Sequence, residues 1–302
     1  MLYDIVIVGG GPAGLTAALY ALRAEKSVLV LEKLGLGGQI ALSEHVENFP
    51  GISKISGIEF ASNLAAQVEN LGGQIEYETV LEIKDGSPKT VVTDFGEYEA
   101  KSVIIATGVT NRRLGAAGEE NLIGKGISFC AVCDGSFYKN KTVAVIGGGN
   151  TAVEDAIYLS NIASKVYLIH RRTQFRAESR LVRELEGKSN VELVLDSTVE
   201  KFVEDDGFKG IEVINVKTAE KRFLDIDGAF VAVGQIPQSD MLKGFINLDS
   251  NGYVASGEDC RTNIEGIFVA GDCRNKNIRQ LTTAVSDGSI AALAACDYLM
   301  NK

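Results

Sequence analysis

One segment that occurs twice limits the possible folds of this chain more than any other feature. Residues 4–33 and residues 142–171 align without a gap, and they read DIVIVGGGPAGLTAALYALRAEKSVLVLEK and TVAVIGGGNTAVEDAIYLSNIASKVYLIHR. Each copy predicts a β-branched strand, a glycine turn, a helix and a second strand, which is the βαβ unit that binds dinucleotides. A duplicated sheet unit without a ligand is the alternative. Two glycine turns in register, each between a strand and a helix, favour binding.

The glycines of the turn have separate tasks. The key positions are Gly9, Gly11 and Gly14 in the first copy and Gly147, Gly149 and Ala152 in the second. The first permits a tight turn, the second lets the backbone approach a pyrophosphate, and the third keeps the helix close to the sheet. The phosphates then accept hydrogen bonds from unpaired N–H groups at the positive end of the helix dipole.

The residue at the end of the second strand distinguishes the two copies. Glu32 holds this position in the first copy, where an acid accepts the ribose hydroxyls of an adenine dinucleotide. The second copy has His170 there, followed by Arg171 and Arg172, and Arg176 lies one loop further on. Arginines attract a 2′-phosphate through charge-assisted bonds, although a pair of arginines is also common on a solvated basic patch. The first copy is therefore predicted to bind FAD or NAD, and the second NADP(H).

Two different dinucleotides on one chain imply hydride transfer between them. Two nicotinamides side by side would achieve little, whereas FAD in the first copy and NADPH in the second make a flavin reductase.

The sequence FCAVCDGSFY, residues 129–138, contains the only close pair of cysteines, Cys130 and Cys133. A zinc site needs four ligands, but the other cysteines are single and the chain has only 2 histidines, so we predict no metal site. An idle structural pair is a second alternative. A redox-active disulfide is favoured, because the CxxC ring can open and reform and often lowers the pKa of one thiol. Asp134 follows directly, either as an acid that protonates a leaving thiolate or as a turn residue.

Three further strands run into a glycine turn or an aspartate. They are VIIATGVT (103–110), FVAVGQIP (230–237) and IFVAGDC (267–273), and each is otherwise an ordinary strand end. Asp272 in the last of them is placed to accept ribose or ribityl hydroxyls. Residues 282–296 are rich in small residues and predict a buried helix close to the cofactor.

Polar, turn-rich joints at 111–120 and 234–240 bracket the second copy. The chain is therefore predicted to have an α/β fold with two Rossmann-like dinucleotide-binding domains, the second inserted in the first. The predicted domains are residues 1–112 for the first part of the FAD domain, 113–240 for the NADPH domain carrying the CxxC, and 241–302 for the C-terminal part of the FAD domain.

Charge and cysteine usage restrict the partners and the compartment. The net charge of −10 argues against nucleic acid or an anionic membrane surface as the main partner. Five irregularly spaced cysteines do not form a secreted disulfide framework, so a reducing compartment is expected. The apolar N-terminus lacks the basic start of a signal peptide, and GGGPAG would break a membrane span. We expect a cytoplasmic protein.

The chain resembles the low-molecular-weight, bacterial-type thioredoxin reductases along its whole length. The motifs that follow that family's order are GGGPAGLTAALYALRA, GGQI, VENFPG, ATG, CAVCDG, GGGNTAVEDAIYLSNIA, HRRTQFRA and AGDCRNKNIRQLTTAVSDG. Two departures are Ala131-Val132 between the cysteines, where the family often has Ala-Thr, and Cys273 in place of a usual Val. Cys273 is expected to act as a small buried hydrophobe.

The resemblance implies a homodimer with one FAD per chain, NADPH as the donor and thioredoxin as the disulfide substrate. It makes Cys133 the cysteine nearer the flavin, Cys130 the exchange thiol and Asp134 the acid. It implies FAD contacts from Gly9, Gly11, Pro12, Ala13, Gly14, Glu32, Gly38, Gln39, Asn48, Ala106, Gly108, Asp272, Arg279, Gln280 and Leu281. It implies NADPH contacts from Gly149, Asn150, Thr151, His170, Arg171, Arg172 and Arg176. It further implies that the NADPH domain rotates about the two joints.

Three other functions stay open. A related flavin disulfide reductase would serve another CxxC protein, a ferredoxin-fed relative would be expected to have lost the HRR sequence, and a flavin-binding redox sensor would turn over no disulfide. Because this chain keeps both the CxxC and residues 170–172, NADPH-dependent reduction of thioredoxin is the favoured interpretation.

Overall fold

The computed structural model describes residues 1–302 and divides them into two compact units. Unit 1 consists of Met1–Thr110 and Ile236–Lys302, and unit 2 of Asn111–Gln235. The chain passes between the units twice, in strands β7 (Val109–Asn111) and β16 (Gln235–Pro237), which pair with each other. One copy of the repeat lies in each unit. The predicted fold class, with the second dinucleotide-binding domain inserted in the first, is confirmed.

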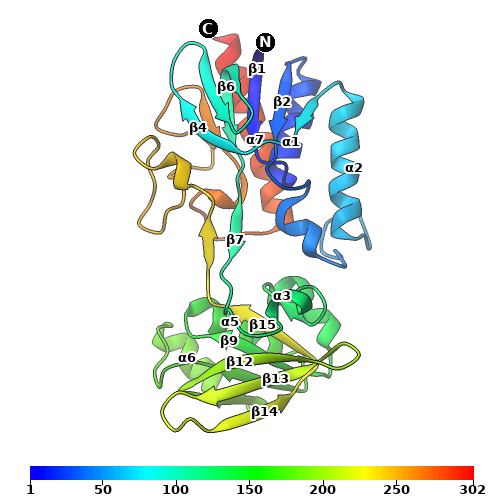
Figure 1. Cartoon of the computed structure of the whole chain (residues 1–302), viewed down its shortest axis with the longest axis vertical. Helices are drawn as coiled ribbons and strands as arrows, with labels where there is room; N and C mark the ends of the chain where they lie inside the picture. The colour runs from blue at the N-terminus through cyan, green and yellow to red at the C-terminus, as the bar shows by residue number, and fades with distance from the viewer. The chain divides into compact units, whose positions relative to one another are not determined.

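Unit 1 is built on a seven-stranded sheet with helices against it (Figure 1). Its strands are β1 (Leu2–Val8), β2 (Val28–Leu31), β3 (Gln74–Glu76), β4 (Val80–Lys84), β5 (Lys89–Thr93), β6 (Glu97–Ile105) and β17 (Ile267–Val269). Its helices are α1 (Pro12–Arg23), α2 (Gly57–Asn70) and α7 (Leu281–Met300), with short 3-10 turns η1 (Gly38–Leu42), η3 (Asp240–Leu242) and η4 (Gly271–Cys273). Helix α7 includes the whole stretch predicted as a buried helix.

Strand β6 carries two different neighbours along one edge. Its first half pairs antiparallel with β5, and its second half pairs parallel with β17. The other strands continue in the parallel order β6-β1-β2-β3. Along β1, Ile5 and Ile7 pack into the core shared with α1 and α7, while Val6 and Val8 pack into the core on the opposite face. The apolar second half of β1, from Ile5 to Val8, is therefore buried on both faces, as parallel strands usually are.

Unit 2 contains two sheets. Its strands are β8 (Ile127–Ser128), β9 (Thr142–Gly147), β10 (Lys165–Ile169), β11 (Val191–Val194), β12 (Ser197–Glu204), β13 (Phe208–Asn215), β14 (Lys221–Asp225) and β15 (Gly228–Ala232). Its helices are α3 (Glu119–Leu122), α4 (Ala131–Asp134), α5 (Asn150–Ser160) and α6 (Ser179–Glu186), with the 3-10 turn η2 (Gly135–Tyr138). The larger sheet is parallel with strand order β11-β10-β9-β15-β8, and strands β12, β13 and β14 form a separate antiparallel sheet.

The antiparallel sheet covers one face of the parallel sheet of unit 2. Its inward side chains Phe202, Ile211 and Leu224 share one core with Ile146 and Ile169. The other face of the parallel sheet packs on α5 and α6 through a second core. The parallel sheet is thus enclosed on both sides, and only its strand ends remain open for a ligand.

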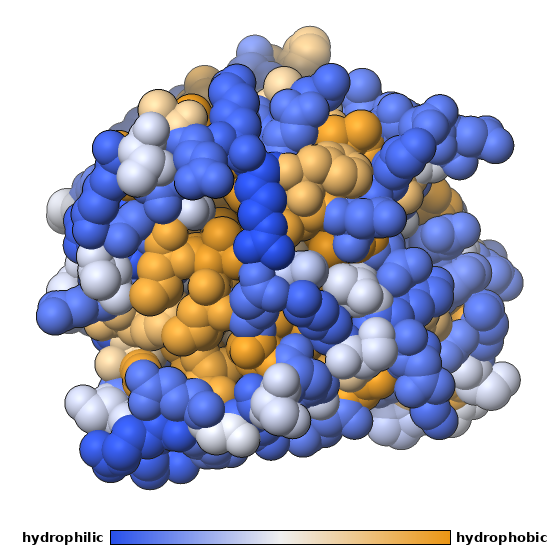
Figure 2. Space-filling model, turned by 90° about the horizontal axis from the view of Figure 1, so that it is seen from below, coloured by the Kyte–Doolittle hydropathy of each residue, from blue (hydrophilic) through white to orange (hydrophobic).

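Apolar and hydrophilic side chains share the surface of the molecule. Figure 2 shows one face on which apolar areas are interrupted by hydrophilic side chains. Among the exposed large apolar residues, Leu34, Ile58 and Phe95 are 84%, 65% and 80% exposed. No helix combines the length and the apolar character that crossing a bilayer requires.

Candidate functional site

Both glycine turns lie where the strand order of a parallel sheet reverses. In unit 1 this is the junction of β1 with β6, and in unit 2 the junction of β9 with β15. Ligands of open α/β sheets bind at such switch points, beyond the carboxyl ends of the strands. Gly9 has φ +115°, and a Cβ there would overlap the carbonyl oxygen of Ala106 at the end of β6. Only glycine fits this close approach of two strand ends.

The last glycine of each GGG turn borders unfilled space at the N-terminus of the helix that follows. Gly11 and Gly149 are the N-caps of α1 and α5, no side chain caps either helix, and a Cβ at either position would meet no atom within 4 Å. In unit 1, a Cβ on Gly38 would lie 3.8 Å from the Gly11 Cα, so the loop that begins η1 borders the same space. A pyrophosphate fits such a space because free N–H groups face it.

Glu32 ends β2 beside the first turn and is only 9% exposed. Its Oε2 accepts a 2.7 Å hydrogen bond from the Gly10 N–H, and its Oε1 accepts one of 2.9 Å from the Leu34 N–H. These bonds fix the direction of the carboxylate. Oε1 also accepts from the Gly35 N–H at 3.4 Å, so Oε2 is the oxygen that retains acceptor capacity for a ribose hydroxyl.

Two buried polar atoms of unit 1 have no hydrogen-bond partner in the chain. They are Thr107 Oγ1 and Asp272 Oδ1, and no other buried side-chain nitrogen or oxygen of residues 1–302 shares this condition. Strands β6 and β17 pair through Ile105 and Val269, so both residues follow neighbouring strand ends. Burial raises the pKa of Asp272, against the charges of nearby cations. Because buried polar atoms without a hydrogen bond are costly, this pair fits a ligand rich in hydroxyl groups.

A buried ion network holds the Asp272 turn in place. The carboxylate of Asp287, on α7, accepts from Arg274 Nε at 2.8 Å and Nη2 at 2.9 Å, and also from the Gly271 N–H at 3.0 Å. Lys276 Nζ lies 2.9 Å from Asp287 Oδ2 and 3.5 Å from Asp272 Oδ1. Burial raises the pKa of Asp287, but the hydrogen bonds from Arg274 and Lys276 outweigh it and lower that pKa below its usual range. No local sequence pattern predicted this network.

The other residues expected to contact FAD lie in several different elements of unit 1. Arg279 bonds the backbone carbonyls of Asp272 and Arg274 at 3.2 and 3.3 Å, so it supports the same turn. Gln280 is the N-cap of α7, and Leu281 is its first residue. Asn48 is exposed in the loop before α2. Pro12 and Ala13 begin α1, Ala106 and Gly108 follow β6, and Gln39 lies in η1.

His170 ends β10 beside the second turn. Its ring lies over Gly148, since a Cβ there would overlap the ring, and it stacks on Phe175 at 5.3 Å. Its Nε2 lies 3.1 Å from the carbonyl oxygen of Gln174. Burial lowers the pKa of His170, and the three neighbouring arginines act in the same direction. The ring is therefore a neutral, packed support for the turn.

The arginines of unit 2 extend from this support into solvent. Arg171, Arg172 and Arg176 are exposed, and none of them forms an ion pair or a side-chain hydrogen bond in the chain. Asn150 secures their loop, because its Oδ1 accepts from the Glu178 N–H at 2.9 Å. Thr151 follows it, exposed, in the first turn of α5. Unpaired guanidinium groups on a fixed loop suit a phosphate ligand.

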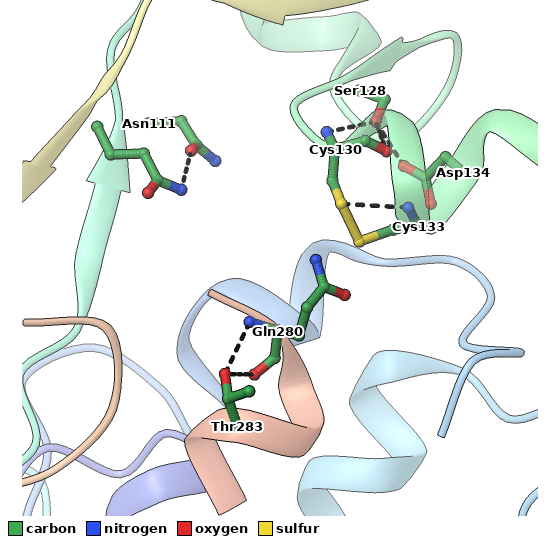
Figure 3. The surroundings of a disulfide bond; sticks show 8 residues. Asn111, Ser128, Cys130, Cys133, Asp134, Gln280 and Thr283 are labelled. Carbon is green, nitrogen blue, oxygen red and sulfur yellow. Dashed lines mark hydrogen bonds between the residues drawn. A yellow bond between two sulfur atoms is a disulfide. The ribbon is translucent and has the colours of Figure 1, made fainter. Parts of the chain in front are cut away.

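Cys130 and Cys133 are joined by a disulfide at the start of α4, with a Cα–Cα distance of 5.3 Å (Figure 3). Cys130 is the N-cap, and its sulfur accepts a 3.2 Å hydrogen bond from the Cys133 N–H. Of the two residues between them, Ala131 is buried and Val132 is 54% exposed. Cys273 is buried, as expected for a small hydrophobe.

Ser128 connects the disulfide segment to Asp134. Its Oγ accepts a 3.0 Å hydrogen bond from the Cys130 N–H and donates one of 2.6 Å to Asp134 Oδ2 (Figure 3). Burial raises the pKa of Asp134, and the Ser128 hydroxyl opposes that rise. Ser128 was not predicted as a functional residue, although a serine two residues before a CxxC was a usable signal. Asp134 is thus a half-buried carboxyl whose raised pKa favours the protonated form that an acid requires.

Comparison with known proteins gives consistent results over the whole chain. The model of the pyridine nucleotide-disulphide oxidoreductase family matches residues 3–288. The chain is 41% identical to the thioredoxin reductase of Listeria monocytogenes, over 99% of this chain and 94% of that protein. It is 39% identical to the thioredoxin reductase of Bacillus subtilis, over 99% and 95%. The crystal structure of thioredoxin reductase from Streptococcus pyogenes superposes with a TM-score of 0.96, at 41% identity and 100% and 99% coverage.

Proposed function

This chain belongs to the pyridine nucleotide-disulphide oxidoreductase family, and we propose that it is a thioredoxin reductase that uses NADPH and FAD. The observation that carries the proposal is the Cys130–Cys133 disulfide beside Asp134. The same chain contains two glycine turns, one followed by an acid at the ribose position and the other by exposed arginines. The full-length similarity to named thioredoxin reductases supports it.

The two cofactors supply hydride transfer when they are bound. In unit 1 the open turn at Gly11 would hold the pyrophosphate of FAD, Glu32 would accept ribose hydroxyls, and Asp272 and Thr107 would hydrogen-bond other hydroxyls of the cofactor. In unit 2 the turn at Gly149 receives the pyrophosphate of NADPH, and the exposed arginines bind its 2′-phosphate.

The reduced pair exchanges with the disulfide of thioredoxin in two balanced steps. The Cys130 thiolate attacks one substrate sulfur, a mixed disulfide forms, and the leaving thiolate takes the proton of Asp134. The Asp134 carboxylate then accepts the proton of the Cys133 thiol. That second thiolate attacks the mixed disulfide, reforms the Cys130–Cys133 bond and releases the other substrate sulfur as a thiolate. Asp134 ends as it began, protonated.

We further propose that the protein is a cytoplasmic homodimer in which unit 2 rotates about the two chain crossings. The exposed apolar side chains of unit 1, such as Leu34 and Ile58, support the dimer, because exposed apolar surface favours association. Light scattering of the purified protein measures the dimer directly. The paired strands β7 and β16 support the hinge, because element ends absorb a change of dihedral angles.

The test is NADPH oxidation with and without a thioredoxin, followed by absorbance. We expect steady turnover only when thioredoxin is present. Cys130→Ser and Cys133→Ser should each keep flavin that NADPH reduces but lose thioredoxin reduction, because exchange needs both an attacking and a resolving sulfur. A single mutant with normal turnover would exclude this mechanism. Cys296→Ser is the matched control, because this free thiol lies in the core on α7 and has no role in the exchange steps.

A further inference from the structure

We infer that Ser128 is a positioning residue of the exchange reaction, whose hydroxyl holds Asp134 in both of its protonation states by reversing the direction of one hydrogen bond. The inference rests on the proposed function, because Asp134 alternates between acid and carboxylate only if it takes part in exchange.

The contacts of the Ser128 hydroxyl allow only a few arrangements of its single hydrogen. The Cys130 N–H donates to Oγ at 3.0 Å and so occupies one lone pair. The hydroxyl hydrogen then points either to Asp134 Oδ2 at 2.6 Å or to the Cys130 carbonyl oxygen at 3.4 Å. The side chain itself is fixed, because Ser128 is 8% exposed and belongs to strand β8, which pairs with β15.

Each arrangement suits one state of the acid. When Asp134 is ionised, the Ser128 hydroxyl donates to Oδ2, and the short bond stabilises the carboxylate. When Asp134 is protonated, its own O–H donates to Ser128 Oγ, and the serine hydrogen turns toward the Cys130 carbonyl. The heavy atoms stay in place while a proton leaves and returns. A residue that can only donate or only accept would favour one state and hinder the other.

The same hydroxyl ties the acid to the exchange cysteine. Ser128 Oγ fixes the Cys130 amide, and Cys130 is the N-cap from which the disulfide begins. Asp134 closes the same turn, because its N–H donates to the Cys130 carbonyl oxygen at 3.1 Å. One side chain thus sets the position of both the acid and the exchange cysteine.

Four other titratable side chains lie on the elements that pack against α4. The elements that pack on α4 carry Glu154, Asp155 and Tyr158 on α5 and Tyr138 on η2. None of these groups contributes to the shift in the pKa of Asp134, whose causes are burial and then the Ser128 hydroxyl. Asp155 nevertheless titrates in the working range, because burial, and then Glu154, raises its pKa to about 7. The pH experiment is therefore run in an Asp155→Asn background as well.

The experiment measures the rate at which pre-reduced enzyme reduces thioredoxin as a function of pH, in Ser128→Ala, Ser128→Thr and Ser128→Val. Threonine keeps the hydroxyl, and valine is its isosteric match without it. We expect the alanine and valine variants to be slower by about tenfold at neutral pH, as is typical for loss of a charge-assisted bond. Their alkaline limb should move to higher pH, because the hydroxyl lowers the pKa of Asp134. The threonine variant should restore both properties.

Reduction of the flavin by NADPH is the internal control, and it should not change in any variant. Ser160→Ala is the matched serine deletion, because the Ser160 hydroxyl only bonds the Ile157 carbonyl on α5. If native enzyme fails to reduce thioredoxin, the proposed function is wrong. If native enzyme succeeds but the valine variant has the native rate and pH profile, or the threonine variant is as slow as valine, the role of Ser128 is wrong. The threonine–valine pair decides the matter even if the alanine variant does not fold.

Discussion

In both copies of the repeat, the residue that follows the second strand contacts the second glycine of the GGG turn, which is Gly10 in unit 1 and Gly148 in unit 2. In unit 1 this residue is Glu32, whose Oε2 accepts the Gly10 N–H, and in unit 2 it is His170, whose ring lies over Gly148. The backbone plan is shared, but one copy presents a carboxylate and the other a neutral ring followed by free arginines. Nucleotide choice is therefore separable from the fold, because it depends on one strand end and the loop after it.

The third position of the turn shows a second difference. A Cβ on Gly14 would overlap the carbonyl oxygen of Gly9, whereas Ala152 fits its place in unit 2 with no exposed surface. Helix α7 also packs closely on α1, because a Cβ on Gly288 of α7 would overlap the Ala13 carbonyl oxygen. Helix α5 has no such partner helix of small residues. The first turn is thus more tightly enclosed than the second, and it tolerates less change.

The largest expected effect comes from filling the open space of one turn at a time. Gly11→Leu should yield folded but colourless protein, because its backbone is extended and its Cβ meets no protein atom, yet the side chain occupies the pyrophosphate space. Gly149→Leu should keep flavin but lose its reduction by NADPH. Flavin absorbance and circular dichroism measure both. A yellow Gly11→Leu protein would contradict unit 1 as the flavin site.

The next effect concerns packing at the third position. Gly14→Ala should destabilise unit 1 by roughly 3 kcal/mol, because overpacking against backbone cannot relax easily. The reverse change, Ala152→Gly, should destabilise unit 2 by only about 1 kcal/mol, the usual cost of glycine in a helix. Urea unfolding followed by fluorescence compares the two. Equal losses would mean that the two turns are enclosed to the same degree.

A smaller effect is expected from removing the two arginines that are proposed to bind the 2′-phosphate of NADPH. Arg171→Ala combined with Arg172→Ala should raise the Michaelis constant for NADPH roughly tenfold to a hundredfold, from the loss of about 1.5–3 kcal/mol of charge-assisted bonding. The constant for NADH should change little, because NADH lacks the 2′-phosphate. The turnover number should move less, since the phosphate is remote from the hydride. Equal losses for both nucleotides would assign these arginines to folding instead.

The smallest effect is a pH dependence of unit 2. Burial, foremost, lowers the pKa of His170 in the folded state, so folding favours the neutral ring. This contribution is present above the unfolded pKa of about 6.5 and is lost as the pH falls below it. His170→Gln should therefore reduce the loss of stability between neutral and mildly acidic pH. Denaturation curves of the native protein and the variant at the two pH values provide the measurement, and an unchanged pH dependence would contradict this role of His170.

Local patterns in the sequence were enough to predict the two βαβ units and the redox pair. Strands β1 and β9 and the glycine turns after them can be recognised from a few consecutive residues, and the small residues of α7 indicated that this helix is buried. The antiparallel sheet β12–β14 was not predicted, because its position depends on a tertiary contact with the parallel sheet. The same holds for Asp287, which meets Arg274 only when α7 docks with a particular rotation. Ser128 was missed because its role depends on a bond to a residue across the turn of α4.

The interrupted course of unit 1 has a consequence for how the protein is made. Residues 111–235 are contiguous, so unit 2 is complete on the ribosome before residues 236–302 of unit 1 have been translated. Domains fold as units during synthesis, and unit 1 must wait for its last helix. Until α7 emerges, the small-residue side of α1 that receives Gly288 stays uncovered, and Asp287 is absent from the turn that it fixes. The unit that is translated first is therefore the last to complete its fold. A nascent chain stalled before α7 would contain a folded unit 2 and an incompletely folded unit 1.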